Sequence, residues 1–131
     1  MDGKILVTGG AGYIGSHVVA ALADAGYASI ILDSFVTSSR AVVPRLSALT
    51  GYALDLVEAD VRDAAALRRT FHDHAIAAVV HCAALKGVAD GEETDVYGGQ
   101  AWDGISMVAH AMAQAIGACT VVATSTEALF Y

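Results

Sequence analysis

Short apolar runs alternate with longer stretches of helical periodicity along the chain. The runs predict five strands, at residues 4–8, 28–33, 54–58, 77–82 and 118–124. Apolar positions three or four residues apart predict helices at 13–25, 39–50, 64–75 and 93–116. This alternation predicts an α/β fold with a doubly wound parallel sheet. The expected strand order is 3-2-1-4, with the fifth strand beside the fourth.

Residues at the predicted helix ends support these boundaries. Asp63 directly precedes the run Ala64 to Leu67, where its carboxylate can cap the first turn. Gly26, Gly51 and Gly117 each follow a helical stretch, where glycine commonly ends a helix.

Length and composition narrow the possible functions. The 131 residues are enough for one domain, and an apolar content of 56% excludes a disordered chain. The formal charge of −7, with Lys4 and Lys86 as the only lysines, leaves no basic patch for a nucleic acid.

One uncharged segment is long enough to be considered as a membrane span. Residues 104–126 contain no Asp, Glu, Lys or Arg, and 23 residues could span a bilayer. The segment also contains His110, Gln114 and the helix breaker Gly117, so it divides into a helix and a strand. We therefore expect no membrane span.

The remaining titratable groups suggest neither disulfides nor a metal. Cys82 and Cys119 fall near predicted strand ends, where a free thiol behaves as a small apolar residue. Because nothing suggests a disulfide framework, the expected location is cytoplasmic. His72 and His74 form a His-x-His pair with no third ligand nearby, which favours a solvated helix face over a metal site.

The segment Thr8 to Gly15 carries the strongest chemical signal. It follows an apolar strand and opens a helix, the context in which spaced glycines bind the phosphates of a dinucleotide. Gly9 allows the tight turn, Gly12 lets the backbone approach a pyrophosphate, and Gly15 lets the helix pack closely on the sheet. The sequence therefore predicts a Rossmann-type fold, with five strands and only part of the complete architecture.

Asp33 ends the second predicted strand, eighteen residues after Gly15. A carboxylate at this place accepts hydrogen bonds from both hydroxyls of an adenosine ribose and repels a 2′-phosphate, so NAD is favoured over NADP. Arg40 is the nearby residue that could bind a 2′-phosphate instead. The alternative for Asp33 is a helix or turn cap.

Several segments resemble the extended short-chain dehydrogenase/reductases. They are Thr8–His17, Ile31–Ser34, Ser38–Arg40, His72–Ile76 and Val79–Val88. The Ala-Ala-Leu-Lys-x-Val string within the last segment is typical of the UDP-glucose 4-epimerase family. The resemblance implies that the chain is the amino-terminal, NAD-binding portion of such an enzyme. Its reaction would interconvert UDP-glucose and UDP-galactose through a transient 4-keto sugar.

The resemblance also implies roles for individual residues. The implied NAD-binding residues are Gly9, Gly12, Tyr13, Ile14 and Gly15 at the pyrophosphate; Asp33, Ser34, Thr37 and Ser38 at the ribose and nearby phosphate; Asp60 and Val61 beside the adenine; and Cys82, Ala83, Ala84 and Lys86 under the nicotinamide. Thr126 would be catalytic, holding the 4-oxygen of the sugar. The alternatives are an ordinary loop lysine for Lys86, a strand end for Thr126 and a turn or cap acid for Asp60.

The chain departs from this family in its acid–base group. The family uses a Tyr-x-x-x-Lys motif, and no tyrosine here has a lysine four residues on. We therefore expect a single NAD-binding domain over residues 1–131, truncated after the fifth strand and without the substrate domain, that is inactive alone. The alternatives are a degenerate Rossmann module that binds nucleotide without catalysis, and another sugar-nucleotide epimerase or dehydratase.

The uncharged strand at 118–124 predicts self-association through its edge, with a homodimer as one form.

Overall fold

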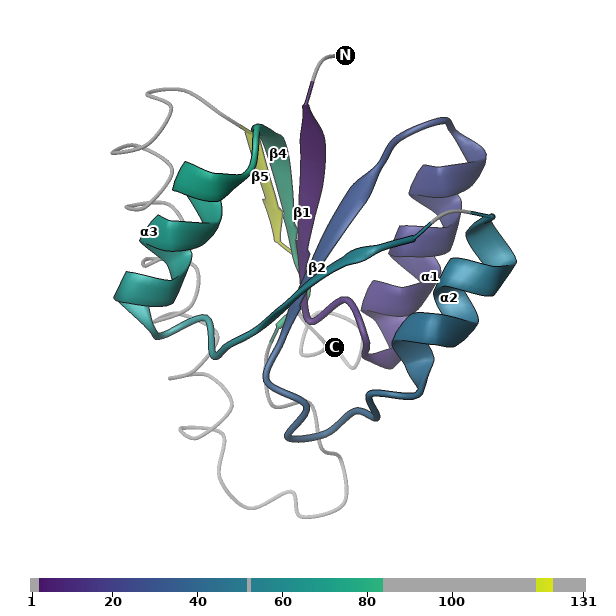
Figure 1. Cartoon of the computed structure of the whole chain (residues 1–131), viewed down its shortest axis with the longest axis horizontal. Helices are drawn as coiled ribbons and strands as arrows, with labels where there is room; N and C mark the ends of the chain where they lie inside the picture. The colour runs from purple at the N-terminus through teal and green to yellow at the C-terminus, as the bar shows by residue number, and fades with distance from the viewer. Residues whose placement is uncertain (1–2, 52, 84–119, 124–131) are drawn as a thin grey trace, which may run out of the picture.

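The computed structural model of the chain describes residues 3–51, 53–83 and 120–123, which form a parallel sheet with helices on both faces (Figure 1). The strands are β1 (Lys4–Thr8), β2 (Ser29–Asp33), β3 (Asp55–Glu58), β4 (Ile76–His81) and β5 (Thr120–Ala123). Their order is β3-β2-β1-β4-β5, and every neighbouring pair is parallel. The α/β class and the predicted 3-2-1-4 order are confirmed.

The helices α1 (Tyr13–Asp24) and α2 (Val42–Thr50) cover one face of the sheet, and α3 (Ala64–Asp73) covers the other (Figure 1). Successive residues of a strand point to opposite faces. Leu6 therefore packs in the core beneath α3, while its neighbour Val7 packs in the core beneath α1 and α2. Both central strands, β1 and β2, are covered on both sides, which explains their unbroken apolar sequences.

The predicted caps of two helices are confirmed. Asp63 Oδ1 accepts a 3.1 Å hydrogen bond from Ala66 N at the start of α3, and Gly51 ends α2 in the left-handed region at φ 85°. The helix predicted at 39–50 begins later, at Val42. The reason is local: Ser39 Oγ accepts a hydrogen bond from Ala41 N, and the carbonyl of Ser39 accepts one from Val42 N, which makes a turn before the helix.

Other predicted features lie partly or wholly outside the described residues, including the helix at 93–116 and its cap Gly117. Within the described ranges, no helix is long and apolar enough to cross a membrane. No group of three or more potential ligands could hold a metal there either.

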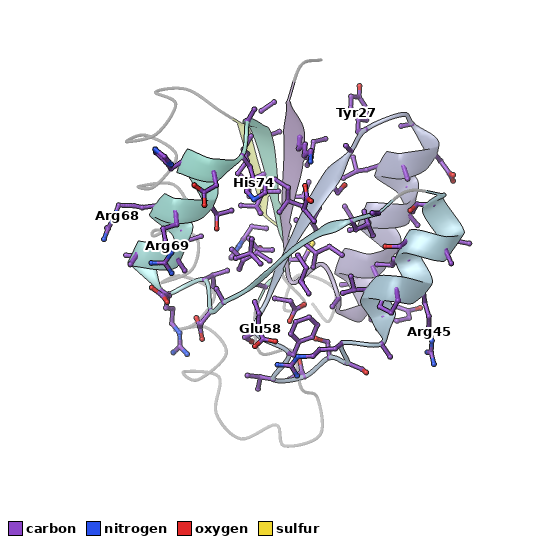
Figure 2. All side chains as sticks on the ribbon, in the orientation of Figure 1. Tyr27, Arg45, Glu58, Arg68, Arg69 and His74 are labelled. Atoms are coloured by element: carbon purple, nitrogen blue, oxygen red, sulfur yellow. The ribbon has the colours of Figure 1, made fainter. Side chains whose placement is uncertain are left out.

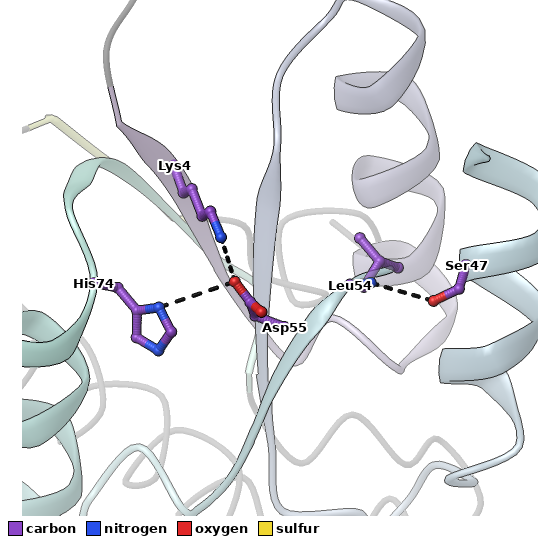
Figure 3. Close-up of polar contacts among 5 residues, drawn as sticks. All are labelled: Lys4, Ser47, Leu54, Asp55 and His74. Carbon is purple, nitrogen blue, oxygen red and sulfur yellow. Dashed lines mark hydrogen bonds and ion pairs between the residues drawn. The ribbon is translucent and has the colours of Figure 1, made fainter. Parts of the chain in front are cut away.

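An ionic cluster lies at the amino end of the sheet (Figure 3). Lys4 Nζ pairs with Asp55 Oδ2, and His74 Nδ1 lies 4.0 Å from the same oxygen. These three residues come from β1, β3 and the end of α3, so the cluster joins elements on either side of β2. Those predicted nucleotide-binding residues that the structure describes lie at the opposite, carboxyl end.

Candidate nucleotide-binding site

The glycine loop after β1 and the first turn of α1 are each packed too tightly for a side chain at one glycine, Gly9 in the loop and Gly15 in the helix. Gly9 has φ +68°, and a Cβ there would lie 2.9 Å from backbone atoms of Cys82 and Ala83. A Cβ on Gly15 would lie 2.0 Å from the carbonyl oxygen of Gly9. The predicted turn and the predicted close approach are therefore both present, and the close approach is between α1 and the loop itself.

Gly10 is a position that the sequence reasoning missed. A Cβ there would lie 3.0 Å from the side chain of Ile31 in β2. The loop thus lies directly on the core, and the only signal for this in the sequence was a second glycine next to Gly9.

The start of α1 has no side chain that caps it. Gly12 is its N-cap at φ −78°, with no side-chain cap and no acidic residue in the first turn. The closest atom to a Cβ on Gly12 would be the carbonyl oxygen of Gly9, at 3.3 Å. The N–H groups of Tyr13 and Ile14 belong to the first turn, whose donors have no partner within a helix. Such a turn attracts phosphate groups.

Asp33 lies at the carboxyl end of β2 and is only 8% exposed. Its Oδ2 accepts a 3.0 Å hydrogen bond from Ala11 N, and its Oδ1 accepts from Phe35 N at 2.8 Å and Ser38 Oγ at 3.0 Å. Asp33 therefore does stabilise the turn that follows it, as the alternative interpretation predicted. A carboxylate offers about four acceptor sites, so one stays available for a ribose hydroxyl beside these three donors.

The loop after β2 wraps around the same carboxylate. Phe35 adopts φ 60°, which is uncommon for a bulky side chain, and its N–H donates to Asp33 Oδ1. Ser34 is partly buried and Thr37 is exposed. Further along, the Arg40 guanidinium lies over the Phe35 ring, 4.8 Å from its centroid. Its Nη2 pairs with Glu58 Oε1 at the end of β3.

The carboxyl ends of β1 and β4 are joined by a buried hydroxyl. Thr8 Oγ1 accepts hydrogen bonds from Cys82 N at 3.1 Å and Ala83 N at 3.3 Å, and lies 2.6 Å from His81 Nδ1. With two donors already on the oxygen, the Thr8 hydroxyl donates its own proton to His81 Nδ1. This network fixes the turn that contains Cys82 and Ala83.

The segment after β3 carries Asp60 and Val61. Asp60 Oδ1 accepts hydrogen bonds from Arg62 N and Nε, and Oδ2 pairs with Arg62 Nη2 at 2.9 Å. The hydrogen bond from the Arg62 side chain lowers the pKa of Asp60, so the acid is ionised at neutral pH. Val61 is 3% exposed and packs in the core beneath α3, so any contact with a nucleotide would come from its backbone.

The structure therefore brings most of the predicted residues to one end of the sheet, at the loops after β1, β2, β3 and β4. Ala84, Lys86 and Thr126 lie outside the described residues. The sequence reasoning missed the contributions of Thr8, Ala11, Glu58 and His81. Three of these are polar residues at or beside the carboxyl ends of strands, a position that would have drawn attention to them.

The pattern of the NAD dependent epimerase/dehydratase family matches residues 5–130. The chain belongs to this family. The UDP-glucose 4-epimerase of Neisseria gonorrhoeae is 39% identical over 128 residues, which are 96% of this chain and 37% of that protein. The bovine UDP-glucose 4-epimerase is 44% identical over 96 residues, which are 69% of this chain and 28% of that protein.

Solved structures of UDP-glucose 4-epimerases also match this chain. The UDP-glucose 4-epimerase of Stenotrophomonas maltophila, with bound NAD and formylated UDP-arabinopyranose, has a TM-score of 0.85 and 39% identity. The match covers 94% of this chain and 37% of that one. The enzyme of Bifidobacterium longum, in complex with NAD+ and UDP, has a TM-score of 0.85 at 29% identity, with 93% and 36% covered. The chain thus spans little more than a third of these epimerases.

Proposed function

We propose that this chain is the NAD-binding portion of a UDP-glucose 4-epimerase. One observation carries the proposal: a glycine loop that admits no Cβ at Gly9 or Gly15 lies within hydrogen-bonding distance of a buried carboxylate, in a chain of the epimerase/dehydratase family. The 4-epimerases among its relatives include structures with bound NAD, which supports the choice of cofactor.

The described residues fit a dinucleotide along the carboxyl edge. The first turn of α1, with the N–H groups of Tyr13 and Ile14, would hold the pyrophosphate. Asp33 would bind the adenosine ribose, with Ser34, Thr37 and Ser38 beside it, and Asp60 and Val61 would flank the adenine. Cys82 and Ala83, with Ala84 and Lys86, would lie under the nicotinamide. NAD supplies a reversible hydride acceptor when bound.

The complete enzyme would act on a UDP-sugar, with Thr126 positioned to hydrogen-bond the 4-oxygen. Within the 131 residues there is no Tyr-x-x-x-Lys to exchange the proton of that oxygen. General acid–base catalysis contributes about 10²–10⁴-fold to a rate. We therefore expect no turnover of UDP-galactose by this chain in a coupled assay, and measurable turnover would contradict that expectation. The cytoplasm is the proposed location.

Calorimetric titration of the purified chain with NAD and with NADP tests cofactor binding. We expect saturable binding of NAD and weaker binding of NADP, because the Asp33 carboxylate would face a 2′-phosphate. Asp24→Asn, an exposed acid at the end of α1, is the control for a change of one charge. Absence of NAD binding by a folded chain would refute the proposed function, and equal binding of NADP would refute the role of Asp33.

A further inference from the structure

We propose that Glu58 is a specificity-determining residue, which holds Arg40 in an ion pair and so keeps that cation from binding a 2′-phosphate. The inference rests on the proposed NAD-binding function and extends it to a second carboxylate. Figure 2 shows Glu58 at the carboxyl end of the sheet, at the end opposite to His74.

The strand register places Glu58 beside Asp33. The two residues are Cα partners in the pairing of β2 with β3, and neighbouring strands are about 4.8 Å apart. The preceding pair, Leu32 and Val57, packs beneath α3. Since side chains alternate along a strand, Asp33 and Glu58 both face the side of α1 and α2. The edge of the proposed ribose site thus carries two adjacent carboxylates.

Arg40 is the only basic residue of the loop at 34–41, so it is the cation that this loop can offer to a 2′-phosphate. Its Nη2 pairs with Glu58 Oε1, and its guanidinium lies over the Phe35 ring. The same loop is tied to Asp33 through Phe35 N and Ser38 Oγ. Asp33 therefore fixes the loop through hydrogen bonds, while Glu58 pairs with the positive charge of the loop.

This arrangement disfavours a 2′-phosphate in two ways. The phosphate would meet the negative charges of Asp33 and Glu58, and it would have to displace Glu58 to gain Arg40. The Arg40 and Glu58 side chains are 66% and 51% exposed, so their ion pair is weak and the effect is a matter of several-fold. Removal of the Glu58 charge should release Arg40 toward a 2′-phosphate.

The test compares adenosine 5′-monophosphate with adenosine 2′,5′-bisphosphate, which differ only in the 2′-phosphate, on the full chain. We expect Glu58→Gln to lower the preference for the monophosphate by roughly three- to fivefold at low salt, and less at high salt. Asp24→Asn, which removes the same charge far from the site, should leave the preference unchanged.

The double variant separates the two causes. If Glu58 acts through Arg40, Glu58→Gln should change the preference clearly less in an Arg40→Ala background, where only the repulsion between Glu58 and the phosphate is removed. An equal change in both backgrounds would mean simple repulsion by Glu58, and no change in either would mean no role; both results overturn the inference. A wild-type chain that binds neither nucleotide would refute the proposed function, and with it this inference. NAD binding with an unaltered preference in Glu58→Gln would refute the inference alone.

Discussion

The Asp33 carboxylate accepts a 3.0 Å hydrogen bond from the main-chain N–H of Ala11, which joins the end of β2 to the glycine loop. The residue that selects the cofactor in the proposed function therefore also shapes the loop that would hold the phosphates. Removing its side chain would disturb both, so a change to alanine would not isolate specificity.

Asp33→Asn should destabilise the chain as well as weaken NAD binding. An amide has one acceptor oxygen, so either Ala11 N or the donors Phe35 N and Ser38 Oγ would face an NH₂ group. An unsatisfied buried donor costs about 1–3 kcal/mol. Urea denaturation should show a loss of this size, against almost none for Asp24→Asn. Unchanged stability would mean that these hydrogen bonds contribute nothing.

The Thr8 hydroxyl should contribute to stability through its buried network. Thr8→Val keeps the shape and removes the oxygen, which strands Ala83 N and His81 Nδ1 without this partner. We expect a loss of about 2–3 kcal/mol in the free energy of unfolding. Thr8→Ser keeps the hydroxyl and should lose only about 1 kcal/mol for the buried methyl. Equal losses for the two variants would contradict a role for the hydrogen bonds.

Gly12 and Gly15 should respond differently to alanine. Gly15→Ala should cost about 3 kcal/mol or more, because its Cβ would overlap the carbonyl oxygen of Gly9. Gly12→Ala, with 3.3 Å to the same oxygen and an ordinary φ, should cost about 1 kcal/mol or less. We expect it to weaken NAD binding by obstructing the pyrophosphate. Thermal melts with NAD titrations check both, and full NAD binding by Gly12→Ala would contradict the placement of the phosphates.

The ion pair between Asp60 and Arg62 should make the free energy of unfolding depend on pH at acidic values. The pKa of Asp60 lies below its ordinary 3.8 in the folded chain, so the unfolded chain takes up the proton first. The contribution is complete well above pH 3.8 and is lost as the pH falls through the lowered pKa.

Urea midpoints at about pH 6 and about pH 3 test this, because Arg62→Ala should lose up to about 1 kcal/mol at the higher pH and less at the lower. Arg68→Ala, an exposed arginine of α3, is the matched control and should show no such difference (Figure 2). The same loss at both pH values would exclude the ion pair as its cause.

Self-association through residues 118–124 stays a prediction. In the described sheet, β5 pairs with β4 and no described strand pairs with its other edge. The sequence of β5 contains no Lys or Pro, the residues that usually protect an edge. Light scattering at micromolar concentration should show oligomers, and Val122→Lys should reduce them. A monodisperse monomer would contradict the prediction.

The sequence by itself determined the first four strands, the starts of α1 and α3, and the glycine loop, because these depend on neighbours along the chain. Apolar runs mark strands that are covered on both faces, and Asp63, directly before Ala64, caps the helix that follows. The start of α2 was wrong because Ser39 forms a local turn that helical periodicity does not reveal.

Only the tertiary structure decided which polar groups meet. Thr8 and His81 are 73 residues apart, and Glu58 pairs with Arg40 because the register of β2 and β3 sets it beside Asp33. The sequence offered Arg40 as a ligand for a 2′-phosphate, and the fold gives it a carboxylate partner instead. Composition and spacing cannot encode such pairs directly, since strand register is fixed by packing across the whole sheet.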